Sequence, residues 1–126
     1  MRYETEQAWL LPFLKTIRTR PGMYLGHENV RLLWQYLSGY SQARVDLGLS
    51  PFGLGEPDHL REFTAWLRER HGHVHSTIGW YDVIGLLDPS ERNIRTFFIE
   101  FDAYLFANGL DFGDVEPRQP ESLWLR

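Results

Sequence analysis

The sequence contains no cysteine, so disulfides, thiol nucleophiles and cysteine-based zinc sites are excluded. Lys15 is the only lysine, and the lysine-bearing phosphate loop G-x-x-x-x-G-K is not found. No apolar run approaches the ~18–20 residues that cross a bilayer, and the first residues lack the basic and apolar stretches of a signal peptide. We therefore expect a cytoplasmic protein that makes no membrane contact.

What the chain does contain is typical of a folded domain. It has 126 residues, of which 43% are hydrophobic and 15% aromatic, and this is enough to bury a core. Charged residues make up 24%, which is ordinary for a globular domain and argues against disorder. Length and composition together indicate one domain over residues 1–126.

The formal net charge of −4 is unevenly distributed along the chain. Residues 1–98 carry eleven bases and eleven acids, whereas residues 99–126 carry six acids against Arg118 and Arg126. A chain with a pI near 5.7 is a poor general binder of nucleic acid. The localised acidic surplus instead favours a partner protein with a basic surface.

Apolar residues recur at helical spacing through most of the chain. The spacing predicts helices over 28–47, 57–71, 77–87 and 88–108, with a further one near residues 9–17 in which Pro12 marks the start or a kink. The run IRTFFIEFDAYLF (94–106) also has strand-like composition, but its length and its 3–4 spacing favour a helix. The expected core follows that spacing: Trp9, Leu10, Phe13, Leu14, Ile17, Leu33, Tyr36, Leu37, Tyr40, Leu47, Leu60, Phe63, Thr64, Leu67, Trp80, Val83, Ile84, Leu87, Ile94, Phe97, Phe98, Phe101 and Leu105.

The fold class that follows is all-α: one domain of about five helices. The helical body is expected over 1–109, followed by an irregular acidic segment, 110–126, whose apolar end packs back on the body. Within the body, Asp88 followed by Pro89 is expected to cap the last helix. Ser76 or Thr77 is expected to cap the helix before it.

The most distinctive segment is R-P-G-M-Y-L-G, from Arg20 to Gly26. Pro21 fixes φ and Gly22 permits a positive φ, so a turn is expected there. The apolar side chains are expected to alternate, with Met23 and Leu25 facing the core and Tyr24 facing out, or the reverse. On this interpretation the segment is an ordered connector attached to the core.

With the preceding I-R-T, this segment resembles the start of the ATPase domain of DNA gyrase B and topoisomerase IV. The resemblance implies a nucleotide contact through Arg20, Gly22, Tyr24 and Gly26. The next helix of that family carries a catalytic Glu and a magnesium-binding Asn, but the helix here, LLWQYLSGYSQARVDL, has neither. ATP hydrolysis is therefore not expected, and a nucleotide-binding module is kept as an alternative.

A wider and less specific resemblance covers most of the chain. After the R-P-G-M-Y-L-G segment come G-Y-x-x-A at Gly39, F-x-x-W-L at Phe63, G-W-x-x-V at Gly79 and F-F-x-x-F-D at Phe97. This order is similar to small stand-alone bacterial proteins, some of which resemble the immunity partners of polymorphic toxins. The resemblance implies a protein that binds and neutralises a cognate toxin, and it identifies no binding residue.

Three histidines, His71, His73 and His75, lie within five residues. In an extended segment they would point to one side, and imidazole is a ligand for Zn, Cu or Ni. Asp82 or His59 would be a fourth ligand. The other interpretation is a solvated loop after a helix end, where histidine also suits the helix dipole. A metal-binding loop is thus a second alternative.

Taken together, these patterns favour a non-enzymatic immunity protein that occludes the active site of a bacterial toxin. No G-x-S-x-G elbow points to nucleophilic catalysis, and no cofactor is expected. Many toxins that act on nucleic acids present a basic groove, onto which an acidic segment would be steered. The residues expected at the interface are acids and aromatic anchors of the C-terminal segment: Asp111, Phe112, Asp114, Glu116 and Trp124.

Overall fold

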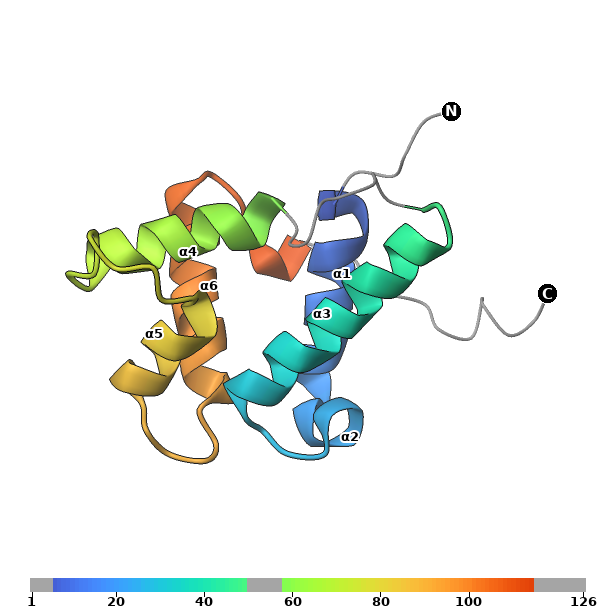
Figure 1. Ribbon diagram of the computed structural model, residues 1–126, viewed down its shortest axis with the longest axis horizontal. Coiled ribbons are helices and arrows are strands. Elements are labelled where there is room, and N and C mark those ends of the chain that lie inside the picture. The colour runs from blue at the N-terminus through green and yellow to red at the C-terminus, as the bar shows by residue number, and fades with distance from the viewer. Residues whose placement is uncertain (1–5, 50–57, 115–126) are drawn as a thin grey trace.

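The computed structural model describes residues 6–49 and 58–114, and this part of the chain consists of helices and turns without strands (Figure 1). The elements are α1 (Glu6–Thr19), α2 (Pro21–Leu25), α3 (Val30–Asp46), α4 (Asp58–Arg70), α5 (Trp80–Leu87), α6 (Ile94–Ala107) and the 3₁₀ turn η1 (Phe112–Asp114). The all-α prediction is confirmed, and α2 is an additional short helix where a turn was expected. None of the helices described is long and apolar enough to cross a membrane.

The helices pack as two sides around one core. In Figure 1, α3 crosses in front of α1 on one side, while α4 and α5 lie in front of α6 on the other. α4 packs against α1, α5 and α6, and α5 also packs against α3. The short α2 contacts α1 and α3 where the chain passes from one to the other. The buried side chains of all these helices except α2 therefore meet in one continuous cluster.

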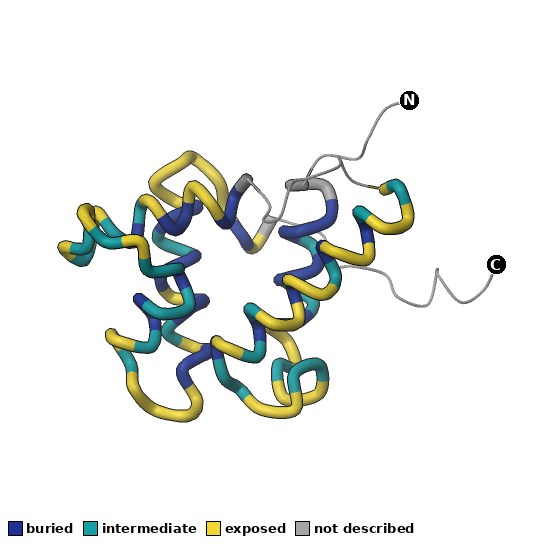
Figure 2. Tube along the Cα trace, in the orientation of Figure 1, coloured by how far each residue is buried: buried dark blue, intermediate teal, exposed yellow. Residues whose placement is uncertain are grey.

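The burial pattern of α6 distinguishes a helix from the strand that its composition also allowed. Phe97, Phe98, Phe101 and Leu105 are buried, whereas Ile99 is 56% exposed. A strand would put Phe97, Ile99 and Phe101 on one face, because its side chains alternate. Figure 2 shows the buried positions turned toward the interior, with exposed positions on the outside of the helices.

Aromatic rings fill the centre of the core. Phe63 of α4 lies edge-on to Phe101 of α6, with ring centroids 5.0 Å apart, and 5.5 Å from Tyr104. Phe97 stacks on Phe101 at 5.4 Å and lies 5.2 Å from Trp80 of α5. Edge-to-face and offset pairs of this kind add to the stability gained by burial alone. The high aromatic content of the sequence is therefore used largely inside the protein.

Three predicted core positions are exposed and therefore wrong: Tyr36, at 38%, and two leucines at helix ends. Leu47 and Leu87 are exposed, because each lies in or beyond the last turn of its helix, where no neighbouring helix covers it. The buried position near the end of α3 is taken by Arg44, whose guanidinium lies over the ring of Trp9, 5.2 Å from its centroid. An arginine can occupy such a site because its stem is apolar and its charged group stacks on an aromatic face.

Glycines mark helix ends as the sequence predicts. Gly48, Gly72 and Gly109 follow α3, α4 and α6, and their φ values are 74°, 79° and 73°. A residue with a Cβ is strained in this left-handed conformation, so glycine is the natural stop.

The predicted helix starts are less accurate. α6 begins at Ile94 and not at Asp88, because the Asp88 carboxylate accepts from the Ser90 N–H and the Thr96 hydroxyl and so holds a turn before the helix. α5 begins after Gly79, with no side-chain cap. The hydroxyl of Ser76 accepts from the Ile78 N–H and therefore closes a turn before α5. Ser76 does not cap the helix itself.

The start of α3 is held by an asparagine from a distant part of the chain. Asn29 accepts from the Arg31 N–H as a conventional N-cap. The neighbouring Val30 N–H is buried and donates to Oδ1 of Asn93, 63 residues away, at 2.8 Å. Nδ2 of Asn93 donates to the carbonyl of Asp88. One buried side chain therefore joins the start of α3 to the link between α5 and α6.

Candidate functional site

The R-P-G-M-Y-L-G segment forms α2, a helix of five residues with Pro21 at its start. The expectation of a turn at Gly22 is wrong, since the positive φ of 82° belongs to Gly26. Met23 is 64% exposed, while Tyr24 and Leu25 are half-buried and pack against the core. The alternation expected for an extended segment is therefore replaced by the pattern of a single helical turn.

A hollow of about 510 Å³ lies beside this segment. Its lining includes two bases, Arg20 and Arg92, and two acids, Glu28 and Glu91. These four charges sum to zero, and polyphosphate sites in proteins present a surplus of positive charge or a cradle of backbone N–H groups. The hollow therefore does not favour the nucleotide-binding alternative.

Phe112, predicted as an exposed anchor, is only 5% exposed. Its ring lies edge-on to Phe98 and Phe101 of α6, with centroids 6.2 and 5.8 Å away. The prediction is wrong because burial of this large apolar ring at the end of the core stabilises the fold more than its exposure to water would. Phe112 instead ties η1 to α6.

The other predicted partner residues are placed in part. Asp111 is exposed, and its carboxylate accepts from the Gly113 N–H at 2.8 Å. Glu116 and Trp124, together with the side chain of Asp114, lie outside the described residues. Their place at an interface stays a prediction.

Two of the acids that make up the C-terminal surplus are already paired within the fold. Glu100 is buried and accepts from His71 at 2.6 Å, with Arg70 at 3.3 Å. Asp102 accepts two hydrogen bonds from the guanidinium of Arg18, each 2.8 Å long. Arg70 of α4 and Arg18 of α1 therefore compensate two acids of α6 that lie far from these two bases in the sequence. The acidic patch is smaller than the sequence suggests.

The histidine segment does not gather a metal site. Residues 71–75 form turns instead of an extended strand, and His71 points back to α6 while His75 is exposed. Asp82 pairs with an arginine of α3. Within 6–49 and 58–114, no three His, Asp or Glu side chains are grouped so as to hold a metal ion. The fold therefore gives the metal-binding alternative no support.

Three polar side chains join α4 to α6 across the core edge. The Tyr104 hydroxyl donates to Glu62 at 3.1 Å, so its oxygen is left to accept from Nδ1 of His59, also at 3.1 Å. Burial lowers the pKa of His59, and the nearby Glu62 carboxylate only partly opposes this. Burial also raises the pKa of Tyr104, with Glu62 adding to the effect. Because Tyr104 and His59 are buried, we interpret the network as a structural link.

The depressed pKa of His59 predicts lower stability in mild acid. In the unfolded chain the imidazole of His59 takes up a proton near pH 6.5, whereas in the folded protein it does so only at a lower pH. The free energy of unfolding therefore decreases as the pH falls below 6.5. The loss is at most about 1.4 kcal/mol per pH unit. Melting temperatures at pH 7.5 and 5.5 should show a smaller drop for His59→Gln than for the wild type. The exposed His75→Gln variant, as the control, should keep the full drop.

An apolar stripe runs along the outer face of α6. It consists of Ile99, Ala103 and Phe106 of α6 and of Leu110, which follows the end of that helix, and we call it the outer stripe. The spacing of four and three residues puts the first three on one side of the helix. Phe106 is 84% exposed, the largest value among the exposed large apolar residues of the described part. Phe106, Ala103 and Leu110 also line a groove of about 460 Å³ that continues to Asp111.

Comparison of the chain with protein-family models, with curated proteins and with solved structures found no match. The resemblances described above therefore rest on their short motifs alone.

The outer stripe was missed because α6 is apolar on more than one side. Seven residues of α6 are buried. Ile99 and Phe106, which are seven residues apart, lie on the exposed side of the helix. The sequence signal for the outer stripe is that apolar residues occupy more of the circumference of α6 than one buried face requires.

Proposed function

We propose that the chain is a non-enzymatic protein-binding protein of the immunity type, which docks on a bacterial toxin through the outer stripe. The exposed Phe106 at the edge of a groove is the observation that carries the proposal. Binding energy at protein interfaces is concentrated in a few large side chains, aromatic ones above all, that enter pockets at the centre of the contact. Contiguous exposed apolar residues rimmed by charge are typical of such surfaces.

The charges beside the stripe support a basic partner. Residues 99–114 contain four acids and no base. Two of the four are compensated by α1 and α4, which leaves the exposed Asp111 beside the groove. Exposed carboxylates at the rim of an apolar contact speed association with a positive surface more than they add affinity. A toxin domain with a basic groove has the chemistry that this arrangement fits.

The non-enzymatic part of the proposal is supported by the polar groups of the body. The His59–Tyr104–Glu62 network contains two buried members, and a tyrosine with a raised pKa is a poor base or nucleophile at neutral pH. The hollow beside α2 has a balanced charge. These features are typical of a structural scaffold.

The proposal predicts that Phe106→Asp weakens toxin binding about tenfold or more, because a charge would replace the central apolar side chain. The partner to test is the protein encoded beside this chain's gene, with binding measured by calorimetry and protection by growth on co-expression. Leu86→Asp is the matched control, since Leu86 of α5 is 65% exposed and lies outside the stripe.

The two halves of the proposal fail in different ways. If Phe106→Asp binds and protects as well as the wild type, the outer stripe is not the interface. If the wild type neither binds nor protects against that protein, the immunity function is wrong. Circular dichroism of each variant verifies that the helices are intact.

A further inference from the structure

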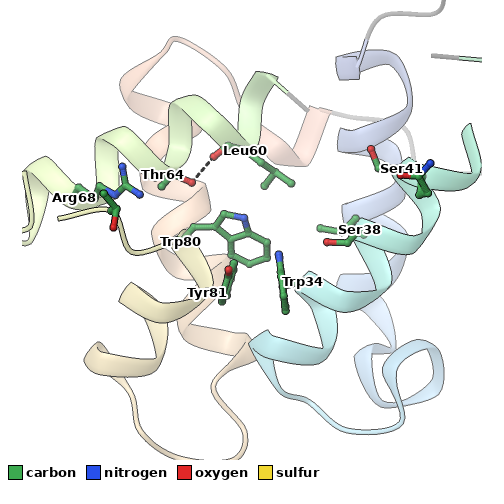
Figure 3. Close-up of a pocket in the computed structure, with 12 residues that line it drawn as sticks. Trp34, Ser38, Ser41, Leu60, Thr64, Arg68, Trp80 and Tyr81 are labelled. Carbon is green, nitrogen blue, oxygen red and sulfur yellow. Dashed lines mark hydrogen bonds between the residues drawn. The ribbon is translucent and has the colours of Figure 1, made fainter. Parts of the chain in front are cut away.

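A cleft of about 480 Å³ opens between α3, α4 and α5, away from the outer stripe (Figure 3). The partly exposed Trp34 and Tyr81 supply the aromatic wall, the fully buried Trp80 also lines the cleft, and hydroxyl groups come from α3 and α4. In Figure 3, Trp34 and Trp80 approach the same space from opposite helices, with Arg68 at the α4 end. A concave site with apolar walls and a few polar groups is the usual form of a small-molecule site.

The aromatic wall is fixed without a ligand. Trp34 and Tyr81 stack with centroids 4.2 Å apart and an interplanar angle of 26°. Arg31 lies over Tyr81, 5.2 Å from its centroid, and is held there by Asp82 at 2.8 Å. A Cβ at Gly79 would lie 2.7 Å from the Tyr81 ring, so glycine leaves the ring room to take this position. A preformed wall lowers the entropy lost when a flat molecule packs against it.

Arg68 is the one charged residue that lines the cleft among the residues described. Its Nε donates to the carbonyl of Ile78 at 2.7 Å, which orients the half-buried guanidinium. No acid of the described ranges forms an ion pair with it. The remaining N–H groups of an oriented guanidinium match the two oxygens of a carboxylate.

We propose that this cleft binds a small planar aromatic carboxylate. The ring of the ligand packs against the partly exposed Trp34, and its carboxylate pairs with Arg68. Ser38 and Thr64 also line the cleft, and their hydroxyl groups are available to polar atoms of the ligand. Among the described residues, the lining carries a single positive charge and no acid, which suits a monoanion. The site is independent of the toxin-binding proposal, because it uses other helices and other residues.

The test uses 2-naphthoate and its neutral analogue 2-naphthamide as probes. Binding is followed by the NMR shifts of the indole N–H groups of Trp34 and Trp80 as each probe is added. We expect saturable shifts with both probes and tighter binding of the carboxylate. Arg68→Gln should weaken naphthoate binding about tenfold and leave naphthamide unchanged. Arg95→Gln, on the exposed side of α6, should bind both probes as the wild type does.

A second variant keeps the test decisive if Arg68→Gln disturbs the turn at Ile78. Ser38 is exposed at the rim of the cleft, so Ser38→Phe should fold and should block both probes. Three results overturn the proposal: no saturable shift at millimolar naphthoate, unchanged binding in Ser38→Phe, or equal loss of both probes in Arg68→Gln with native spectra elsewhere.

Discussion

Replacing Phe97 with alanine should lower the free energy of unfolding by about 3–5 kcal/mol. The ring is fully buried, with Trp80, Phe63 and Phe101 at centroid distances of 5.2, 5.6 and 5.4 Å. Its removal forfeits the transfer of a large apolar side chain out of water and leaves a cavity that helices α4, α5 and α6 cannot all close. Urea denaturation followed by circular dichroism measures the loss as a lower midpoint at unchanged slope.

Ile99→Ala is the matched control for this prediction. Ile99 lies two residues further along α6 and is 56% exposed, so its truncation should cost no more than about 0.5 kcal/mol. The pair also tests the secondary structure, because residues 97 and 99 share a face in a strand and not in a helix. Comparable losses at the two positions would contradict the helical assignment of α6.

The fold was predictable where the physics is local or periodic. The 3–4 spacing places Phe97, Phe98 and Phe101 on one side of a helix whatever surrounds them, and Gly48 and Gly72 end their helices because they alone accept a positive φ cheaply. Helix starts were harder to predict. Asp88 has every feature of an N-cap, but its carboxylate is used by a turn, and the Ile94 N–H at the start of α6 donates to the carbonyl of Glu28.

The site was predictable only in part, for reasons that involve distant residues. The net charge of a segment does not reveal that Arg18, 84 residues before Asp102, compensates it. Nor does the sequence around Phe112 reveal that α6 offers its ring a place in the core. Phe106 escaped notice for the converse reason, because helical spacing shows which residues share a face and not which faces find a neighbour.

Asn93 is the residue whose importance follows least from its local sequence, and Asn93→Ala should lower the free energy of unfolding by about 2–3 kcal/mol. The substitution leaves the buried Val30 N–H without an acceptor and the Asp88 carbonyl without one of its donors. A buried polar group that loses its partner retains its cost of desolvation, which exceeds the net value of an ordinary hydrogen bond. Urea denaturation of the variant and the wild type measures the difference.

Two further variants show whether the cost lies in these two bonds. Asn108→Ala should cost less than about 1 kcal/mol, because Asn108 is exposed and its side chain donates to a carbonyl of the helix that it follows, that of Tyr104. Asn93→Asp keeps an acceptor for the Val30 N–H but no longer donates to the Asp88 carbonyl, and it adds a negative charge near the Asp88 carboxylate. It should therefore recover only part of the stability lost in Asn93→Ala. If Asn93→Ala is no more harmful than Asn108→Ala, the start of α3 does not depend on this side chain, and Asn29 alone is sufficient to begin the helix.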